Sequence, residues 1–121
     1  MKIRAMVFIC AAFALFAFAG CGDGPPLAPL NLVVTSTSPI MLKWDGSLSA
    51  SSYNVYRSTV SGGISTKLLL ASNSLSGSVG LLTAYTDLLT TVGVTYYYQV
   101  TEVNGDKESD GSNEVSATAT P

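Results

Sequence analysis

The stretch Val94–Asn104, which reads Val-Thr-Tyr-Tyr-Tyr-Gln-Val-Thr-Glu-Val-Asn, decides the fold of this chain. It is the longest run with strand composition that no Gly or Pro interrupts. Successive side chains of a strand point to opposite faces, so one face holds Tyr96, Tyr98 and Val100, and the other holds Tyr97, Gln99 and Thr101. This pattern is typical of a strand that is buried on one side only. We therefore expect a layered β fold with the first of these faces in the core.

Six further runs of strand-forming residues flank this stretch, at 30–35, 40–45, 53–58, 67–71, 83–87 and 112–119. Ser38-Pro39 breaks the chain between the first two, since proline has no N–H to donate to a sheet. Asn104-Gly105 favours a tight hairpin, because both residues tolerate a positive φ. Residues 72–82 are a long connection, which we expect to be a surface excursion over the leucines of 67–71. Seven short strands at hairpin spacing predict an all-β, seven-stranded, immunoglobulin-like Greek-key β-sandwich.

The same alternation predicts the core residues. They are Trp44, Tyr53, Val55, Tyr85, Tyr96, Tyr98 and Val100. Glu102 also falls at an inward position of Val94–Asn104. Burying a carboxylate without a partner there would destabilise the fold by several kcal/mol. Either Glu102 has a partner or it lies beyond the edge of the sandwich, and we expect the edge.

The first twenty residues have the organisation of a secretion signal. Met1-Lys2-Ile3-Arg4 is a basic head, and residues 5–19 are an uncharged apolar run of 15 residues. A helix of that length is too short to span a bilayer core of about 30 Å, so we expect a cleaved signal helix over residues 1–20. Phe18-Ala19-Gly20-Cys21 resembles a bacterial lipobox, which implies cleavage before Cys21 and acylation of that cysteine. The alternative is an ordinary signal, cut after Ala19 or Gly20, that leaves Cys21 as a free thiol.

A Gly- and Pro-rich segment follows the signal. Residues 21–28 form the expected tether, with a reach of roughly 20–25 Å at about 3 Å per residue, and residues 29–121 form the domain. The mature chain keeps one cysteine, so it has no internal disulfide. Its four basic and eight acidic residues give a net charge of −4, which argues against nucleic acid as a partner.

The domain resembles the fibronectin type III family over residues 29–121. Trp44 falls where the family has its core tryptophan, and Tyr53-Asn54-Val55-Tyr56-Arg57-Ser58 is similar to its third strand. Tyr85-Thr86-Asp87 resembles the end of the fifth strand, and Gly93-Val94-Thr95-Tyr96, with Val100 and Val103-Asn104, resembles the sixth. The resemblance implies that Tyr96 is a tyrosine-corner residue, whose hydroxyl bonds back to the preceding loop.

The sequence offers little for catalysis or for a metal. It has no histidine, and Cys21 is expected to be acylated, which argues against His-based triads, thiol catalysis and His/Cys zinc sites. Residues 106–111 are similar to half of a calcium loop, but Ala117 stands at the twelfth position, where a bidentate acid is needed. Asn104-Gly105-Asp106 occupies the place of the adhesion tripeptide of some fibronectin modules but lacks its arginine, so a turn role is favoured. We expect no enzyme activity, no metal and no cofactor.

One surface is a candidate for binding. Tyr56, Tyr97 and Gln99 are expected on the outer face of neighbouring strands, where exposed aromatic rings stack on sugars or anchor proteins; the plainer interpretation is that tyrosine suits a solvated strand. The sequence therefore favours a lipid-anchored, non-catalytic module for protein contact, adhesion or assembly, with carbohydrate binding by the tyrosine face as the alternative. Gly22 after the acylated cysteine favours the outer over the inner membrane, by resemblance to lipoproteins of diderm bacteria.

Overall fold

The computed structural model describes residues 24–74 and 83–121. The strands are β1 (Leu30–Thr37), β2 (Ile40–Asp45), β3 (Ser52–Ser58), β4 (Leu68–Ser74), β5 (Ala84–Asp87), β6 (Thr95–Asn104), β7 (Lys107–Glu108) and β8 (Val115–Thr118), with a 3-10 turn, η1, at Ile64–Thr66. The predicted signal helix, the acylation of Cys21 and most of the 72–82 excursion lie outside the described residues. In the part described, no helix has the length and apolarity needed to cross a bilayer.

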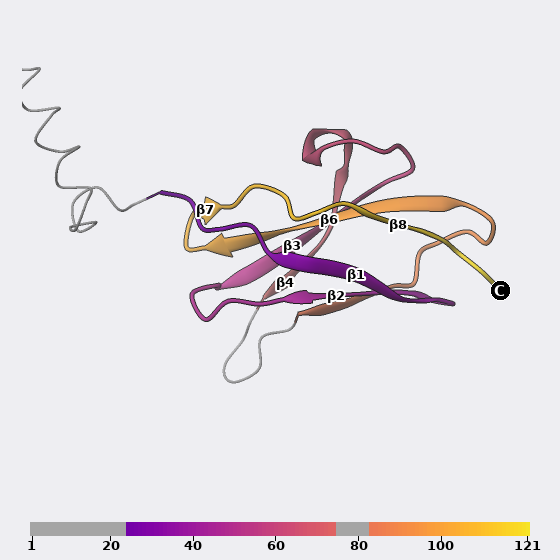
Figure 1. Ribbon diagram of the computed structural model, residues 1–121, viewed down its shortest axis with the longest axis horizontal. Helices are drawn as coiled ribbons and strands as arrows, with labels where there is room; N and C mark the ends of the chain where they lie inside the picture. The colour runs from indigo at the N-terminus through magenta and orange to yellow at the C-terminus, as the bar shows by residue number, and fades with distance from the viewer. Residues whose placement is uncertain (1–23, 75–82) are drawn as a thin grey trace, which may run out of the picture.

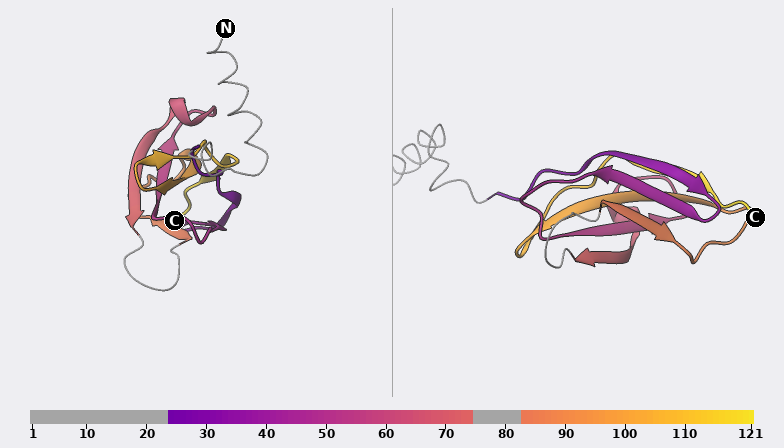
Figure 2. Two further views of the ribbon diagram at one scale, coloured as in Figure 1. Left: turned by 90° about the vertical axis from the view of Figure 1, so that its left-hand side faces the viewer. Right: turned by 90° about the horizontal axis from the view of Figure 1, so that it is seen from below.

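The strands form two facing antiparallel sheets (Figure 1). One sheet has the order β1-β2-β5, and the other has the order β4-β3-β6-β7, with β8 also paired to β6. The tether enters at one end of the sandwich, and the last strand leaves at the opposite end (Figure 2). The prediction of an all-β sandwich is confirmed, although the last strand is divided in two.

Serine side chains explain why the last strand is divided. Between β7 and β8, Ser109 N–H donates to the Glu102 carbonyl (2.8 Å) and Ser112 N–H donates to the Val100 carbonyl (2.8 Å). In return, Glu102 N–H donates to Ser109 Oγ (2.8 Å) and Val100 N–H donates to Ser112 Oγ (3.0 Å). The serine hydroxyls accept the bonds that carbonyl groups would accept in a regular ladder. The backbone N–H groups of Val100 and Glu102 therefore keep their acceptors where the neighbouring segment loses strand geometry. The continuous strand predicted at 112–119 is therefore wrong in its first three residues, and β8 also ends one residue earlier than predicted, at Thr118.

Asn113 joins the last strand to the other sheet. Its amide oxygen accepts from Leu32 N–H (3.0 Å), and its amide nitrogen donates to the Leu32 carbonyl (2.9 Å). Further along, Thr120 N–H donates to the Thr37 carbonyl (2.9 Å). β1 therefore lies beside the β8 segment, and one edge of the sandwich is closed by polar contacts.

The core confirms most of the predicted residues. Trp44, Tyr53, Val55, Tyr96, Tyr98 and Val100 are buried, whereas Tyr85 is half-buried at the margin. The Trp44 and Tyr53 rings meet edge to face, with centroids 5.5 Å apart and an interplanar angle of 66°. Such pairs contribute about 0.5–1.5 kcal/mol beyond the burial of their area.

A buried carboxylate connects the two sheets. Asp87, on β5, is fully buried and accepts from Arg57 Nη1 (2.8 Å) and from the Tyr98 hydroxyl (2.7 Å), both on the opposite sheet. Its second oxygen accepts from Leu89 N–H (3.0 Å). The Arg57 guanidinium also lies 4.9 Å above the Tyr96 ring. Burial and then the hydrogen bond to Asp87 raise the pKa of Tyr98 far above its ordinary value, so this hydroxyl is a permanent donor.

The expected tyrosine corner is present. Thr91 N–H donates to the Tyr96 hydroxyl (2.9 Å), which ties the β5–β6 connection to the start of β6. The bond confirms the role that the resemblance implied for Tyr96.

Two local predictions need correction. Glu102 does not lie beyond the sandwich edge, because it is 3% exposed and accepts from Ser49 Oγ (3.2 Å). The hairpin turn falls one residue later than predicted, at Gly105-Asp106, since Asn104 is still paired with Lys107. Gly105 has a φ of +65°, a conformation that glycine adopts without steric cost.

We predict that Asp87→Ala lowers the free energy of unfolding by about 3 kcal/mol, because it leaves Arg57 and the buried Tyr98 hydroxyl without their shared acceptor. Urea denaturation measures the change. Asp45→Ala is the control, because Asp45 is exposed and accepts a single bond from Asn31; it should cost less than about 1 kcal/mol. Equal losses for the two variants would show that the buried carboxylate does not hold the sheets together.

Candidate functional site on the outer face of the five-stranded sheet

The register of the strands places three large side chains on the outer face. Tyr56 is directly opposite Gln99 on β6 and Leu69 on β4. Directly opposed residues of an antiparallel pair share a face, and Tyr97 follows on that face two residues from Gln99. Leu69 is 54% exposed, and both tyrosines are half-buried. We call Leu69, Tyr56 and Tyr97 the outer-face patch.

Gln99 does not belong to this patch, so the prediction that it faces solvent is wrong. It is buried, and its amide nitrogen donates to the Ser112 carbonyl (2.7 Å). A Cβ added to Gly111 would lie 2.8 Å from this nitrogen and 3.3 Å from Ile64 Cδ1. The chain therefore covers Gln99 with a glycine and with η1, and Gln99 serves the structure.

Glu108 is an acceptor beside Tyr56, at one side of the patch. Its Oε2 accepts from the Tyr56 hydroxyl (2.5 Å), Thr101 Oγ1 (2.6 Å) and Asn54 Nδ2 (3.1 Å). Partial burial alone would raise the pKa of this carboxyl, but the hydrogen bonds from Thr101, Tyr56 and Asn54 outweigh it and lower the pKa. Sequence reasoning missed Glu108, although the correct hairpin register, with Glu108 opposite Val103, would have placed it on this face.

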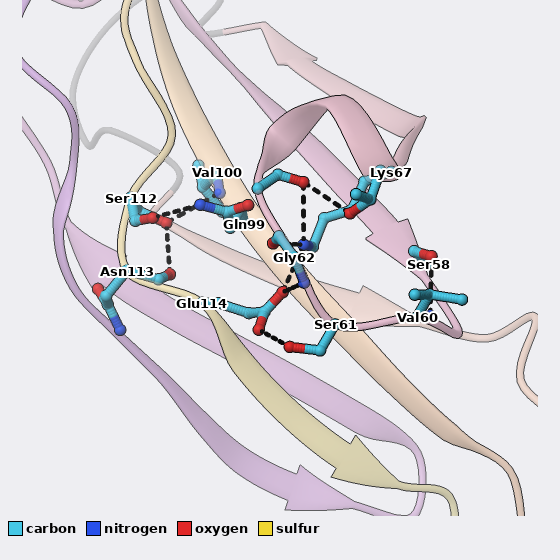
Figure 3. A network of polar contacts seen from close by, with 12 residues as sticks. Ser58, Val60, Ser61, Gly62, Lys67, Gln99, Val100, Ser112, Asn113 and Glu114 are labelled. Atoms are coloured by element: carbon cyan, nitrogen blue, oxygen red, sulfur yellow. Dashed lines mark hydrogen bonds and ion pairs between the residues drawn. The ribbon is translucent and has the colours of Figure 1, made fainter.

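A second polar network fixes the neighbouring loop (Figure 3). The Lys67 side chain is fully buried, and its Nζ donates to Glu114 Oε2 (2.5 Å) and to the Gly62 carbonyl (2.5 Å). Glu114 also accepts from Ser61 Oγ (2.8 Å) and Gly62 N–H (2.9 Å). Partial burial raises the pKa of Glu114, but the bonds from Lys67, Gly62 and Ser61 outweigh it, so the pKa lies below its ordinary value. The loop is thereby held over the sheet.

Beside the patch, β4 borders a hollow. Its volume is about 420 Å³, and its walls include Arg57, Leu68, Leu70 and Tyr96. Leu68 is 81% exposed at the rim. Leu69 also lines this hollow, so the hollow adjoins the outer-face patch along β4.

Comparison with proteins of known structure places the chain in a family. No model of a known protein family matches the sequence. An Fn3-like protein from Clostridium thermocellum is 32% identical, with a TM-score of 0.64, and the alignment covers 82% of this chain and 97% of that protein. The chain belongs to the fibronectin type III-like (Fn3-like) family. A human fibronectin type III domain, 20% identical with a TM-score of 0.60, shares the fold.

Other relatives of the Fn3-like domain are parts of far longer enzymes. An amylopullulanase from Thermoanaerobacter thermohydrosulfuricus is 45% identical over 93 residues, which are 76% of this chain and 6% of the enzyme. A β-1,2-glucanase from Parabacteroides distasonis is 30% identical, with a TM-score of 0.64, over 82% of this chain and 14% of the enzyme. The chain thus spans a small part of the curated relatives that it matches.

Several acidic side chains of the Fn3-like domain are engaged within the fold. Glu108 and Glu114 are engaged by hydrogen-bond donors within the domain, and Asp87 is closed off between the sheets. Across residues 24–74 and 83–121, no three acidic or cysteine side chains gather as a metal site would require. The outer face presents the aromatic and aliphatic side chains of the patch, and the Glu108 carboxylate is bonded to the hydroxyl of one of them, Tyr56.

We predict that Glu114→Gln weakens the acid dependence of stability. The folded-state pKa of Glu114 lies below its ordinary value of 4.5, so its contribution to stability is present above that value and is lost as the pH falls through the folded-state pKa. The variant should be less stable at neutral pH and should lose less stability on acidification than the parent protein.

Urea unfolding at a series of pH values measures this difference. Asp106→Asn, in the exposed hairpin turn, is the matched control for the removal of one carboxylate. A Glu114→Gln protein with the parent slope would contradict the assigned network.

Proposed function

We propose that this chain is a non-catalytic, lipid-anchored protein of the cell envelope whose Fn3-like domain makes protein contacts in adhesion, display or assembly. The outer-face patch carries the proposal. Leu69, Tyr56 and Tyr97 expose apolar area on three adjacent strands, and contiguous apolar surface on a small domain marks an interaction site. Glu108 adds a directional acceptor beside the rings.

Two features support a non-catalytic role. The match to the amylopullulanase covers 6% of that enzyme, as expected of an accessory module. The chain has no histidine, and the carboxylates Asp87, Glu108 and Glu114 are engaged in holding the fold.

The anchor rests on the sequence Phe18-Ala19-Gly20-Cys21. Cleavage before Cys21 and acylation of its thiol and amine leave a tether of residues 21–28 between lipid and domain. Gly22 favours the outer membrane as the destination. Intact-mass measurement of the protein purified from membranes tests the anchor, and an unmodified Cys21 would remove it.

We predict that Leu69→Ser with Tyr97→Ser abolishes retention of a protein partner in a pull-down from native membranes. Truncating an interface anchor commonly costs more than about 1 kcal/mol of binding, and neither side chain makes one of the hydrogen bonds of the Glu108 network. Val33→Ser is the matched control, because Val33 is 46% exposed on the other sheet. Quantitative mass spectrometry reads the co-purified proteins. Equal recovery with the double variant would show that the patch is not the contact surface.

Carbohydrate binding is the second candidate function, because the amylopullulanase and β-1,2-glucanase relatives carry the names of carbohydrate-active enzymes. Tyr97 and Tyr56 would stack on sugar rings, with Glu108 as acceptor for a hydroxyl. If this function holds, the parent protein binds on a glycan array or migrates more slowly in a gel that contains pullulan. We predict that this binding is lost in Tyr97→Ser and kept in Val33→Ser. Absence of any signal from the parent protein would leave protein contact as the function.

A further inference from the structure

Three exposed leucines gather where the tether joins the sandwich. Leu27 is 86% exposed, Leu30 is 66% exposed and Leu48 is 98% exposed. Residues 27–30 and the residues on both sides of Leu48, Ser47 and Ser49, line one hollow of about 200 Å³. These leucines do not belong to the core. They lie at one end, or pole, of the sandwich, and we call them the polar-end leucines, where 'polar' refers to this pole and not to chemical polarity.

The fold brings two connections to this pole. Ser51 N–H donates to the Val103 carbonyl (2.8 Å), and Gly105 N–H donates to Ser51 Oγ (3.1 Å). The β2–β3 connection, which carries Leu48, is therefore tied to the β6–β7 hairpin. Figure 1 shows both beside the incoming tether, while the last strand leaves at the far pole.

The tether identifies what lies against this pole. Leu27 is six residues from Cys21, and six extended residues reach at most about 20 Å. If Cys21 is acylated, as the proposed function holds, Leu27 stays within that distance of the lipid headgroups. Leu30 lies three residues further along the chain, and Leu48 lies between two residues that line the same hollow. Exposed leucines confined near a bilayer partition into its interface, because their apolar area leaves water there.

We propose that the polar-end leucines dock the domain on the surface of the bilayer that holds the anchor, so that the sandwich stands on this pole. This inference rests on the proposed lipid anchor. Three exposed acidic residues, Asp45, Asp106 and Glu108, outnumber Lys107 at this end of the sandwich. Docking therefore favours zwitterionic over anionic lipids, whose surface potential repels carboxylates.

The test separates docking from natural acylation by supplying a synthetic anchor. Residues 21–121 contain one thiol, Cys21, and the buried core lies between Leu32 and Ala119, so this segment folds without the leader. It is coupled through Cys21 to a maleimide phospholipid in phosphatidylcholine vesicles with brominated acyl chains. The Leu48→Trp substitution places a fluorescent tryptophan at the end of the sandwich that carries the tether. Leu88→Trp is the matched control, because Leu88 is 75% exposed in the β5–β6 connection.

We predict that bromine quenches the Leu48→Trp reporter at least about threefold more than the Leu88→Trp reporter, because an interfacial side chain meets the acyl chains. The native Trp44, which is 2% exposed, gives a background that the unsubstituted protein corrects. Leu27→Ser with Leu30→Ser should reduce the quenching at Leu48→Trp, and phosphatidylglycerol should reduce it further.

Two results would overturn the proposal. One is equal quenching of both reporters, or quenching of neither. The other is a blue shift of Leu48→Trp that grows with protein concentration without lipid, since this would assign the leucines to contact between copies of the chain. The mass of natively processed Cys21 tests the anchor itself, so failure of docking and failure of the proposed function remain distinct.

Discussion

The fold depends on a carboxylate buried between its two sheets. Asp87 lies on the short strand β5, which pairs with β2 alone, yet it holds Arg57 and Tyr98 of the opposite sheet. Removing an ion pair from water is costly, and further hydrogen bonds to the carboxylate offset part of that cost. Here Leu89 N–H supplies the remaining bond, so the β5–β6 connection is ordered by the same group. The position of Arg57 over Tyr96 then links this centre to the tyrosine corner.

Side chains also complete the sheet where the backbone does not. Ser109 and Ser112 accept from β6 in place of carbonyl groups, and the Asn113 amide pairs with both backbone groups of Leu32. These substitutions release the chain from strand geometry between β7 and β8, and the released segment passes over Gln99. The polar residues of the last strand therefore shape the part of the outer face that covers Gln99.

The alternation of side chains along the strands predicted some parts of this structure and could not predict others. Alternation assigns each side chain to a face, and it placed Trp44, Tyr53 and Tyr98 in the core. It does not report what covers the other face, so Gln99 was expected in solvent although Gly111 and η1 lie over it. It also does not report where a strand loses regular pairing, since a serine hydroxyl that replaces a carbonyl leaves no periodic signal. The sequence also gives no sign that Lys67 pairs with Glu114, because 47 residues separate them along the chain and only the fold brings them together.

The closure of β1 against β8 has a mechanical consequence. The two strands run side by side in the same direction, and the chain enters at one pole and leaves at the other. A force that pulls the two ends apart therefore slides β1 past β8. The bonds at Leu32 and Thr37 lie across that motion, so they share the load of a pulling force.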